Sequence, residues 1–139
     1  MVSDIGLVTA LLTNITLLPQ TVLGQVGHSV VLNCTFLFHH PTLYDLTVTW
    51  THEDKPVAKY VNKTIIVSSN NKRYSLNQPR RVFTPHSQLD YDNSLLTISD
   101  LSLTDDLSVY RCNVNHVYKK TKAKWWDLTS IMTLQMTGE

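Results

Sequence analysis

The sequence predicts an all-β fold in which two antiparallel sheets pack face to face as a sandwich. Several short runs alternate apolar and polar residues with a period of two, which places one face of a strand in a core. Residues 30–36 and 46–50 are the clearest of these runs. Tyr110 stands two residues before Cys112, and upstream of it Leu96, Ile98 and Leu101 are spaced like a strand that ends in a turn. This order predicts a strand, a tight corner and a second strand.

The expected strands follow one another with short connections along a chain of 139 residues, which suits one domain. Residues 14–18 form a first strand with Pro19 at a kink or an edge. Further strands are expected at 21–23, 28–36, 46–52, 57–61, 64–67, from 81–83, and at 93–98, 109–115 and 128–136. A long loop over 116–126 joins the last two. Residues 1–13 are an N-terminal extension or a leader remnant, and residues 14–139 form the domain.

Composition excludes several functional classes. Twelve Lys and Arg residues against eleven Asp and Glu give a net charge of +1, so the chain lacks the basic footprint of nucleic-acid binding. It has no Gly-x-Ser-x-Gly elbow, no phosphate-cradling glycine loop and no His-Glu-x-x-His pair. We therefore expect no enzyme, no small-molecule substrate and no cofactor. Because the six histidines are scattered and the two cysteines lie far apart, we expect no metal site.

Four residues stand in the strand phase of an immunoglobulin variable-type domain, which the chain resembles: Cys34, Trp50, Tyr110 and Cys112. The resemblance implies a Greek-key sandwich in which one disulfide joins Cys34 to Cys112 and Trp50 packs on it. The alternative is two separate buried thiols. It also implies a hydrogen bond from the Tyr110 hydroxyl to backbone a few residues upstream. The extra strands at 57–61 and 64–67 are typical of the variable type, and a disulfide indicates a secreted or cell-surface protein.

A charge pair is expected at the bottom of the sandwich. Arg81 begins the strand expected from residue 81. Asp106 lies six residues before Cys112, in the expected corner between two strands. The two side chains are natural partners for a charge-assisted hydrogen bond, and two solvated charges are the alternative. Arg81 and Asp106 therefore join Trp50 and Tyr110 as expected core positions.

Glycosylation is expected at three asparagines. Asn14, Asn33 and Asn62 each begin an Asn-x-Thr triplet, the acceptor pattern of secretory proteins. Asn33 is next to Cys34 in an alternating strand, so its side chain is expected to point outward.

Longer stretches are similar to the butyrophilin-like T-cell costimulatory and checkpoint ligands, which include the programmed death ligands. Residues 46–50, 53–55, 81–83, 87–101 and 109–112 carry this resemblance. One departure is Ser108, where the family usually has glycine. Antigen-receptor variable domains carry a Gly-x-Gly bulge in their last strand, whereas residues 126–131 contain no glycine. This difference favours the ligand family over an antigen receptor.

The resemblance implies a cell-surface ligand that binds a protein receptor on T cells or another immune cell. Binding would use the G-F-C-C′ face, meaning the outward surface of the strands at 46–52, 57–61, 109–115 and 128–136. The expected contact residues on the strands are Thr49, Thr51, Lys59, Val61, Arg111, Asn113 and Asn115. Tyr118, Trp125 and Trp126 are expected as anchors in the loop, together with lysines that steer the partner. The alternative for each tryptophan is packing back onto the sheet.

Other interpretations stay open. The chain has the features of a variable-type innate immune receptor, or of a viral or secreted decoy, that reads a ligand with its loops. Residues 118–126 combine four lysines with aromatic residues, a pattern also found in proteins that bind nucleic acid or anionic membranes. One such loop in a chain of balanced charge is thin support, so we expect no nucleic-acid partner and membrane attachment only through a segment outside this sequence.

Overall fold

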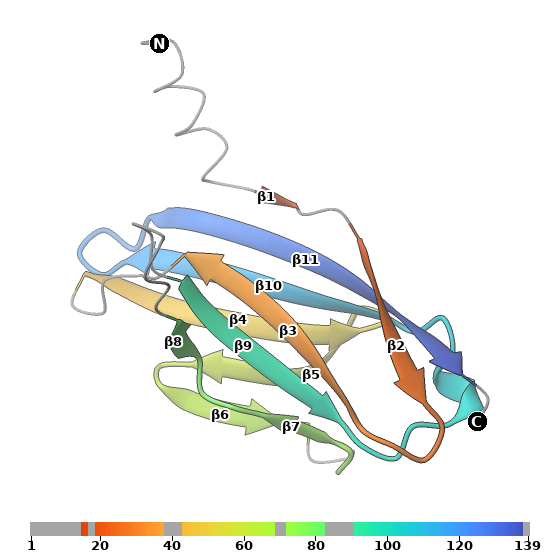
Figure 1. Cartoon of the computed structure of the whole chain (residues 1–139). Helices are drawn as coiled ribbons and strands as arrows, with labels where there is room; N and C mark the ends of the chain where they lie inside the picture. Colours follow the sequence, from red (N-terminus) through yellow and green to blue (C-terminus); the bar gives the residue numbers. More distant parts are fainter. Residues whose placement is uncertain (1–14, 17–18, 38–42, 69–71, 83–90, 138–139) are drawn as a thin grey trace, which may run out of the picture.

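The structure is a computed structural model that describes residues 15–16, 19–37, 43–68, 72–82 and 91–137, without the side chains of residues 15–16, 81–82 and 125–126. The described strands form two sheets that pack as two layers (Figure 1). The predicted all-β two-sheet sandwich is therefore confirmed. Its core lies between the sheets, where inward residues of both layers are buried.

The larger sheet has seven strands in the order β1-β11-β10-β4-β5-β6, and β2 also pairs with β11. β1 and β2 run parallel to β11, and the other neighbours are antiparallel. The bounds are β1 (Ile15–Thr16), β2 (Gln20–Gln25), β4 (Tyr44–His52), β5 (Lys55–Val61), β6 (Thr64–Val67), β10 (Val109–Tyr118) and β11 (Lys124–Thr137).

The smaller sheet has four strands arranged around a central one. β9 (Tyr91–Ile98) pairs antiparallel with β3 (Val30–Leu37), β7 (Tyr74–Leu76) and β8 (Arg80–Val82). A short 3₁₀ helix, η1 (Leu103–Asp105), then leads the chain from β9 into β10 of the other sheet. Because β3 and β9 alternate strictly between buried and less buried residues, their side chains divide cleanly between core and surface.

Two tight hairpins fix the register of β4, β5 and β6. Glu53 and Asp54 connect β4 to β5 with φ angles of 50° and 66°, and Asn62 and Lys63 connect β5 to β6 with φ angles of 51° and 62°. Two central residues with positive φ are the mark of type I′ turns, whose twist matches that of the flanking strands. The three strands therefore present their outward residues as one surface.

The strand expected from residue 81 begins earlier in the structure. Tyr74 already pairs with Ile98 in β7, and the pairing resumes in β8, where Arg80 lies opposite Asn93. The register shifts by one residue between these two short strands. Each has only three residues, so neither carries the alternating pattern needed for recognition from sequence.

The long loop expected over residues 116–126 is a short connection instead. β10 continues to Tyr118 and β11 begins at Lys124. The backbone of Tyr118 donates to Ala123 at 2.8 Å, and Lys122 donates back to Tyr118 at 2.8 Å. Trp125 and Trp126 therefore belong to a strand of the sheet and not to a loop.

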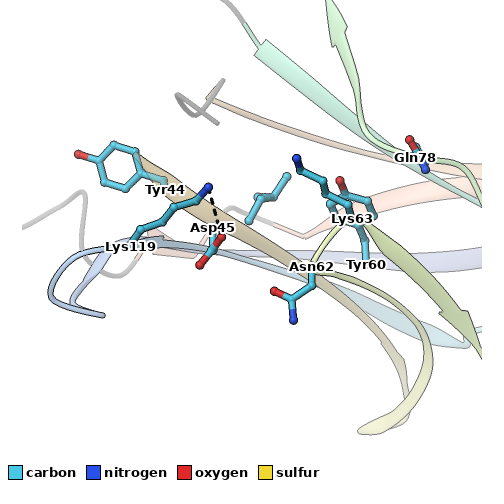
Figure 2. A pocket seen from close by; sticks show the side chains of 8 residues that line it. Tyr44, Asp45, Tyr60, Asn62, Lys63, Gln78 and Lys119 are labelled. Carbon is cyan, nitrogen blue, oxygen red and sulfur yellow. Dashed lines mark ion pairs between the residues drawn. The ribbon is translucent and has the colours of Figure 1, made fainter. Parts of the chain in front are cut away.

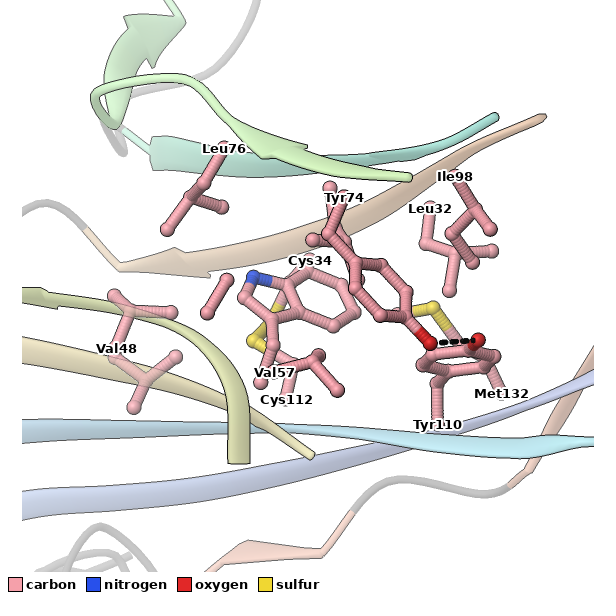
Figure 3. Close-up of a cluster of buried hydrophobic side chains, with 14 of the residues drawn as sticks. Leu32, Cys34, Val48, Val57, Tyr74, Leu76, Ile98, Tyr110, Cys112 and Met132 are labelled. Carbon is pink, nitrogen blue, oxygen red and sulfur yellow. Dashed lines mark hydrogen bonds between the residues drawn. A yellow bond between two sulfur atoms is a disulfide. The ribbon is translucent and has the colours of Figure 1, made fainter. Parts of the chain in front are cut away.

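The disulfide and Trp50 lie at the centre of the core. Cys34 of β3 is bonded to Cys112 of β10 across the two sheets, with the Cα atoms 6.4 Å apart (Figure 3). Trp50 is fully buried, and its indole Nε1 donates to the Ser94 hydroxyl at 3.0 Å. The single polar group of the indole is therefore satisfied, as a buried donor requires. The predicted disulfide is confirmed.

The hydroxyl of Tyr110 has a different partner from the predicted one. It lies 2.8 Å from the hydroxyl of Tyr74 in the opposite sheet, instead of bonding to upstream backbone (Figure 3). The ring of His52 stacks on Tyr110 at a centroid distance of 4.5 Å. Burial and the bond to Tyr74 raise the pKa of Tyr110. Tyr110 is thus a core residue, as expected, but it links two sheets through side chains.

The charge pair near the connection between β9 and β10 is not the predicted pair of Arg81 and Asp106. Asp105, which is 4% exposed, accepts from Arg73 Nη1 at 2.9 Å and from Nη2 at 2.7 Å. This bidentate bond lowers the pKa of Asp105 and raises the pKa of Arg73. Arg73 reaches the corner because it immediately precedes β7, and its carbonyl accepts from the backbone of Ser99 at 2.8 Å.

Asp106 is exposed, and its carboxylate accepts from the backbone nitrogen of Met136 at 2.8 Å. The expectation that Asp106 is a core residue is therefore wrong. The side chain of Arg81 lies outside the described part of the chain, and its backbone pairs with Asp92 in the smaller sheet. The corner uses the first of two adjacent aspartates because η1 turns Asp105 inward and leaves Asp106 at its C-terminal end.

Candidate recognition face

The outward residues of five adjacent strands are in register across the larger sheet. Thr49 of β4 lies directly opposite Lys59 of β5 on one side and Asn113 of β10 on the other. Asn113 is opposite Thr129 of β11, and Lys59 is opposite Ile66 of β6. Since directly paired residues share a face, these five residues form one row across the G-F-C-C′ face and its extension onto β6.

Two further rows run beside the first. In one, Thr47 lies between Val61 and Asn115, and Asn115 is opposite Asp127. In the other, Thr51 is opposite Arg111, which is opposite Ile131. The structure therefore brings together all seven strand residues that were expected to contact a partner: Thr49, Thr51, Lys59, Val61, Arg111, Asn113 and Asn115.

Hydrogen bonds hold the polar side chains of β10 and β11 in fixed positions. Asn113 Nδ2 donates to Asp127 Oδ1 at 2.9 Å and to Thr129 Oγ1 at 3.0 Å. Asn115 Nδ2 donates to Asn113 Oδ1 at 2.6 Å. These bonds fix the side chains at the centre of the face in the free domain.

The charges of the face are distributed around this centre. Arg111 forms an exposed ion pair with Asp54 at 3.2 Å, and Lys124 lies 3.7 Å from Asp127. Lys59 is exposed in the central row. Exposed ion pairs such as these contribute little to the stability of the fold. Charges of both signs on a surface can instead orient an approaching protein.

Ile66 was not expected at this surface, but it is 53% exposed in the same row as Lys59. An exposed isoleucine beside polar residues is a natural apolar contact for a binding surface. The strand at 64–67 was expected, but four residues without a fixed register did not show which of Ile65 and Ile66 faces outward. The pairing with β5 decides this, because Lys59 lies opposite Ile66.

Tyr118, a predicted anchor, lies at the end of β10 and not in a loop. It pairs with Tyr44 of β4, and the two rings are 5.5 Å apart and tilted by 57°. A hollow of about 540 Å³ beside them is lined by Leu43, Tyr44, Tyr118, Thr121, Ala123 and Lys124. The side chains of Trp125 and Trp126, the other predicted anchors, lie outside the described part of the chain.

A second hollow of about 360 Å³ opens at the same end of the sheet, where the start of β4 and the end of β5 meet Gln78 and Lys119 (Figure 2). Tyr60 lines it, and burial followed by the charge of Asp92 raises the pKa of the Tyr60 hydroxyl. Lys119 and Asp45 form an ion pair at 3.9 Å across its other side. This mixture of tyrosines, amides and charges was not recognised in the sequence, because its residues come from separate strands and turns.

The three acceptor asparagines have different placements. Asn33 is exposed in the middle of β3, and Asn62 is exposed in the turn between β5 and β6. Asn14 lies outside the described residues. Within the part of the chain that the structure describes, no group of three or more His, Cys, Asp or Glu side chains is placed to hold a metal ion. None of the described helices is long and apolar enough to cross a membrane.

Solved structures with a similar fold include adhesion and immune-receptor domains. A structure from a study of cell-adhesive interactions of voltage-gated sodium channel β subunits is 17% identical, with a TM-score of 0.60 over 87% of this chain and 93% of the other. Murine CRIg is 16% identical, with a TM-score of 0.59 over 86% and 93%. The natural killer cell receptor NKp44, described as a triggering partner in natural cytotoxicity, is 13% identical, with a TM-score of 0.52 over 84% and 98%.

A sequence comparison with curated proteins finds no significant match. The family model for the immunoglobulin V-set domain matches residues 18–129, which is most of the chain. The match agrees with the two-sheet sandwich and with the disulfide between Cys34 and Cys112. It also agrees with β5 and β6, which follow β4 in the larger sheet and correspond to the additional strands of the variable type. The chain belongs to the immunoglobulin V-set domain family.

Proposed function

We propose that this V-set domain is an extracellular ligand that binds a receptor on T cells or another immune cell through its G-F-C-C′ face. The observation that carries the proposal is the row Ile66, Lys59, Thr49, Asn113 and Thr129, which extends over five strands. Strands in a sheet are spaced about 4.8 Å apart, so this row spans roughly 19 Å. A polar surface of this width with one exposed isoleucine suits a small, reversible protein interface.

The similarity of residues 46–50, 87–101 and 109–112 to the butyrophilin-like ligands supports a costimulatory or inhibitory receptor on T cells as the partner. The fixed polar centre supports the same use, because ordered amides and hydroxyls give directional hydrogen bonds without losing rotamer entropy. Lys59 and Arg111 add positive charge on either side of Thr49 and Thr51, which favours a receptor with acidic residues in its own sheet face.

Binding of the soluble domain to a panel of T-cell costimulatory and inhibitory receptors tests the proposal. The Thr49→Arg/Asn113→Arg double variant places two long cations in the central row and is expected to reduce affinity at least tenfold. Val31→Arg is the matched control, because Val31 is 50% exposed on the smaller sheet and its replacement leaves the face unchanged. Equal loss in both variants, or binding to no receptor of the panel, would contradict the proposal.

A second candidate is a V-type innate immune receptor or a decoy that binds its ligand with the loop end of the domain. The aromatic hollow lined by Tyr44, Tyr118 and Lys124 supports it. Under this alternative, Tyr118→Ala reduces ligand binding and the double variant of the face does not. Surface plasmon resonance with both variants on one chip separates the two candidates.

A further inference from the structure

Beyond protein recognition, we infer that one end of the larger sheet binds a sulfated polysaccharide. The connection between β10 and β11 belongs to a run of four lysines within six residues, a composition typical of segments that bind heparin. All four side chains are exposed: Lys119, Lys120, Lys122 and Lys124. These lysines, Lys63 and the two hollows beside them are called the basic end.

The backbone of the lysine-rich connection is held in place by hydrogen bonds. The two bonds between Tyr118 and residues 122–123 close the hairpin. The backbone nitrogen of Lys119 also donates to the carbonyl of Leu43 at 2.9 Å, which ties the hairpin to the start of β4. These bonds fix the points from which the lysine side chains project.

A fifth lysine reaches the same place from a different connection. Lys63 is exposed in the turn between β5 and β6, and it lines the hollow of about 360 Å³ together with Lys119 (Figure 2). Tyr44 lines this hollow and also the hollow of about 540 Å³ that Lys124 borders. Tyr44 therefore stands between two hollows, each of which has lysine at its edge.

Positive charge at the basic end exceeds the negative charge around it. Lys119 lies 3.9 Å from Asp45, and Lys124 lies 3.7 Å from Asp127. Exposed pairs at such distances are weak and can be exchanged for other anions. Among the described residues, the other three lysines form no ion pair: Lys63, Lys120 and Lys122. Five lysines against two carboxylates leave three uncompensated positive charges, which favours a polyanion as ligand.

The kind of polyanion follows from the two kinds of contact that the basic end offers. Lysines on both sides of Tyr44 suit anionic groups that repeat along a polymer. The rings of Tyr44 and Tyr118, 5.5 Å apart, offer apolar surfaces on which the C–H face of a sugar ring can pack. A domain closed by a disulfide belongs to an oxidising, extracellular compartment, where sulfated polysaccharides are present at cell surfaces. The hollows accept a polymer chain better than they accept the flat surface of a membrane.

Binding of the soluble domain to immobilised heparin, followed by surface plasmon resonance, tests the inference. Lys63→Glu/Lys122→Glu is expected to weaken binding by roughly tenfold or more and to reduce its dependence on salt, because fewer counterions are released. The matched control is Lys55→Glu/Lys72→Glu, which makes the same change in net charge at two exposed lysines away from the basic end. Its effect should stay below about threefold, since salt screens distant charges. Equal losses in the two variants, or no saturable binding by the native domain, would overturn the inference.

A second pair of variants separates the hollows from the charge. Tyr44→Ala should weaken heparin binding several-fold and leave its salt dependence unchanged, because the lost ring carries no charge. Tyr44→Phe keeps the ring and should bind like the native domain. Melting curves of both variants show whether the fold is retained. Native affinity in a folded Tyr44→Ala variant would contradict the role given to the hollows.

Three further probes test the class of ligand: desulfated heparin, a single-stranded oligonucleotide and vesicles that contain phosphatidylserine. We expect each to bind much more weakly than heparin at the same salt concentration. Equal binding of desulfated heparin would contradict recognition of sulfate, and equal binding of the oligonucleotide or the vesicles would contradict recognition of a polysaccharide. Thr49 and Asn113 are unchanged in every variant, so these outcomes are independent of receptor binding by the G-F-C-C′ face.

Discussion

At the scale of single residues, the corner of the domain depends on one buried ion pair. Asp105 and Arg73 are joined by two hydrogen bonds of 2.9 Å and 2.7 Å, and Asp105 also accepts from the backbone of Ser102 at 2.8 Å. The carboxylate is almost completely removed from water, so its charge requires all three donors. Loss of any partner leaves a buried charge uncompensated.

Replacing Asp105 with asparagine is expected to lower the free energy of unfolding by about 3 kcal/mol, because Arg73 then loses its partner in a mostly buried site. Urea denaturation followed by tryptophan fluorescence measures the change. Asp106→Asn is the matched control, and since Asp106 is exposed its effect should stay below about 0.5 kcal/mol. The reverse order of effects would show that Asp106 forms the corner.

The same pair predicts how stability depends on pH. Arg73 holds the pKa of Asp105 below its ordinary value of 3.8, so the ionised carboxylate stabilises the fold at every pH above that value. This contribution is lost as the pH falls below 3.8 and through the lower folded pKa. The difference in unfolding free energy between the native chain and Asp105→Asn should therefore be constant from pH 7 to 5 and shrink at lower pH. A constant difference down to pH 2.5 would contradict the assignment.

At the scale of elements, the connection between β9 and β10 contains a strained position. Leu107 has a φ of 65°, and its side chain is 68% exposed. Its backbone nitrogen donates to the carbonyl of Leu134 in β11 at 2.8 Å. A left-handed conformation is unfavourable for leucine because its Cβ approaches the carbonyl oxygen. The resemblance to butyrophilin-like ligands implies a glycine at Ser108, whereas the positive φ lies one residue earlier, at Leu107.

Leu107→Gly is expected to stabilise the domain by about 0.5 kcal/mol, since glycine adopts this φ without strain and little packing is lost. Leu103→Gly should instead destabilise it by about 1 kcal/mol, because Leu103 is similarly exposed but lies in η1 without a positive φ. Thermal unfolding of both variants measures the opposite signs. Destabilisation by both would show that exposed packing outweighs backbone strain.

At the scale of the whole molecule, the two sheets have different surfaces and share one covalent link. The larger sheet presents the polar rows of the G-F-C-C′ face, and the smaller sheet carries Asn33 and Val31 outward. The disulfide between Cys34 and Cys112 holds the layers together across a separation of 78 residues. The correct placement of both surfaces therefore depends on the packing of the two sheets that this disulfide joins.

Cys34→Ala together with Cys112→Ala should reduce stability by about 4–5 kcal/mol, because an open chain gains the entropy that the long loop otherwise removes. This loss is comparable to the total stability of a domain of this size, so we expect a misfolded product that is poorly secreted. Secretion yield and the melting curve of any secreted protein measure the effect. Normal secretion and melting would contradict a structural role of the bond.

The sequence by itself determined the sandwich, the disulfide, buried Trp50 and the outward phase of Thr49, Lys59 and Asn113. The sandwich and the orientations of these side chains follow from local alternation, because a side chain's face is set by its own position along a strand. The disulfide was expected from the resemblance to variable-type domains. The tertiary structure alone decided that Asp105 and not Asp106 pairs with Arg73, that Tyr110 bonds to Tyr74, and that Ile66 extends the face. Each of these depends on how separate strands and turns are placed against one another, and in a sheet a one-residue shift in register exchanges the inward and outward side chains.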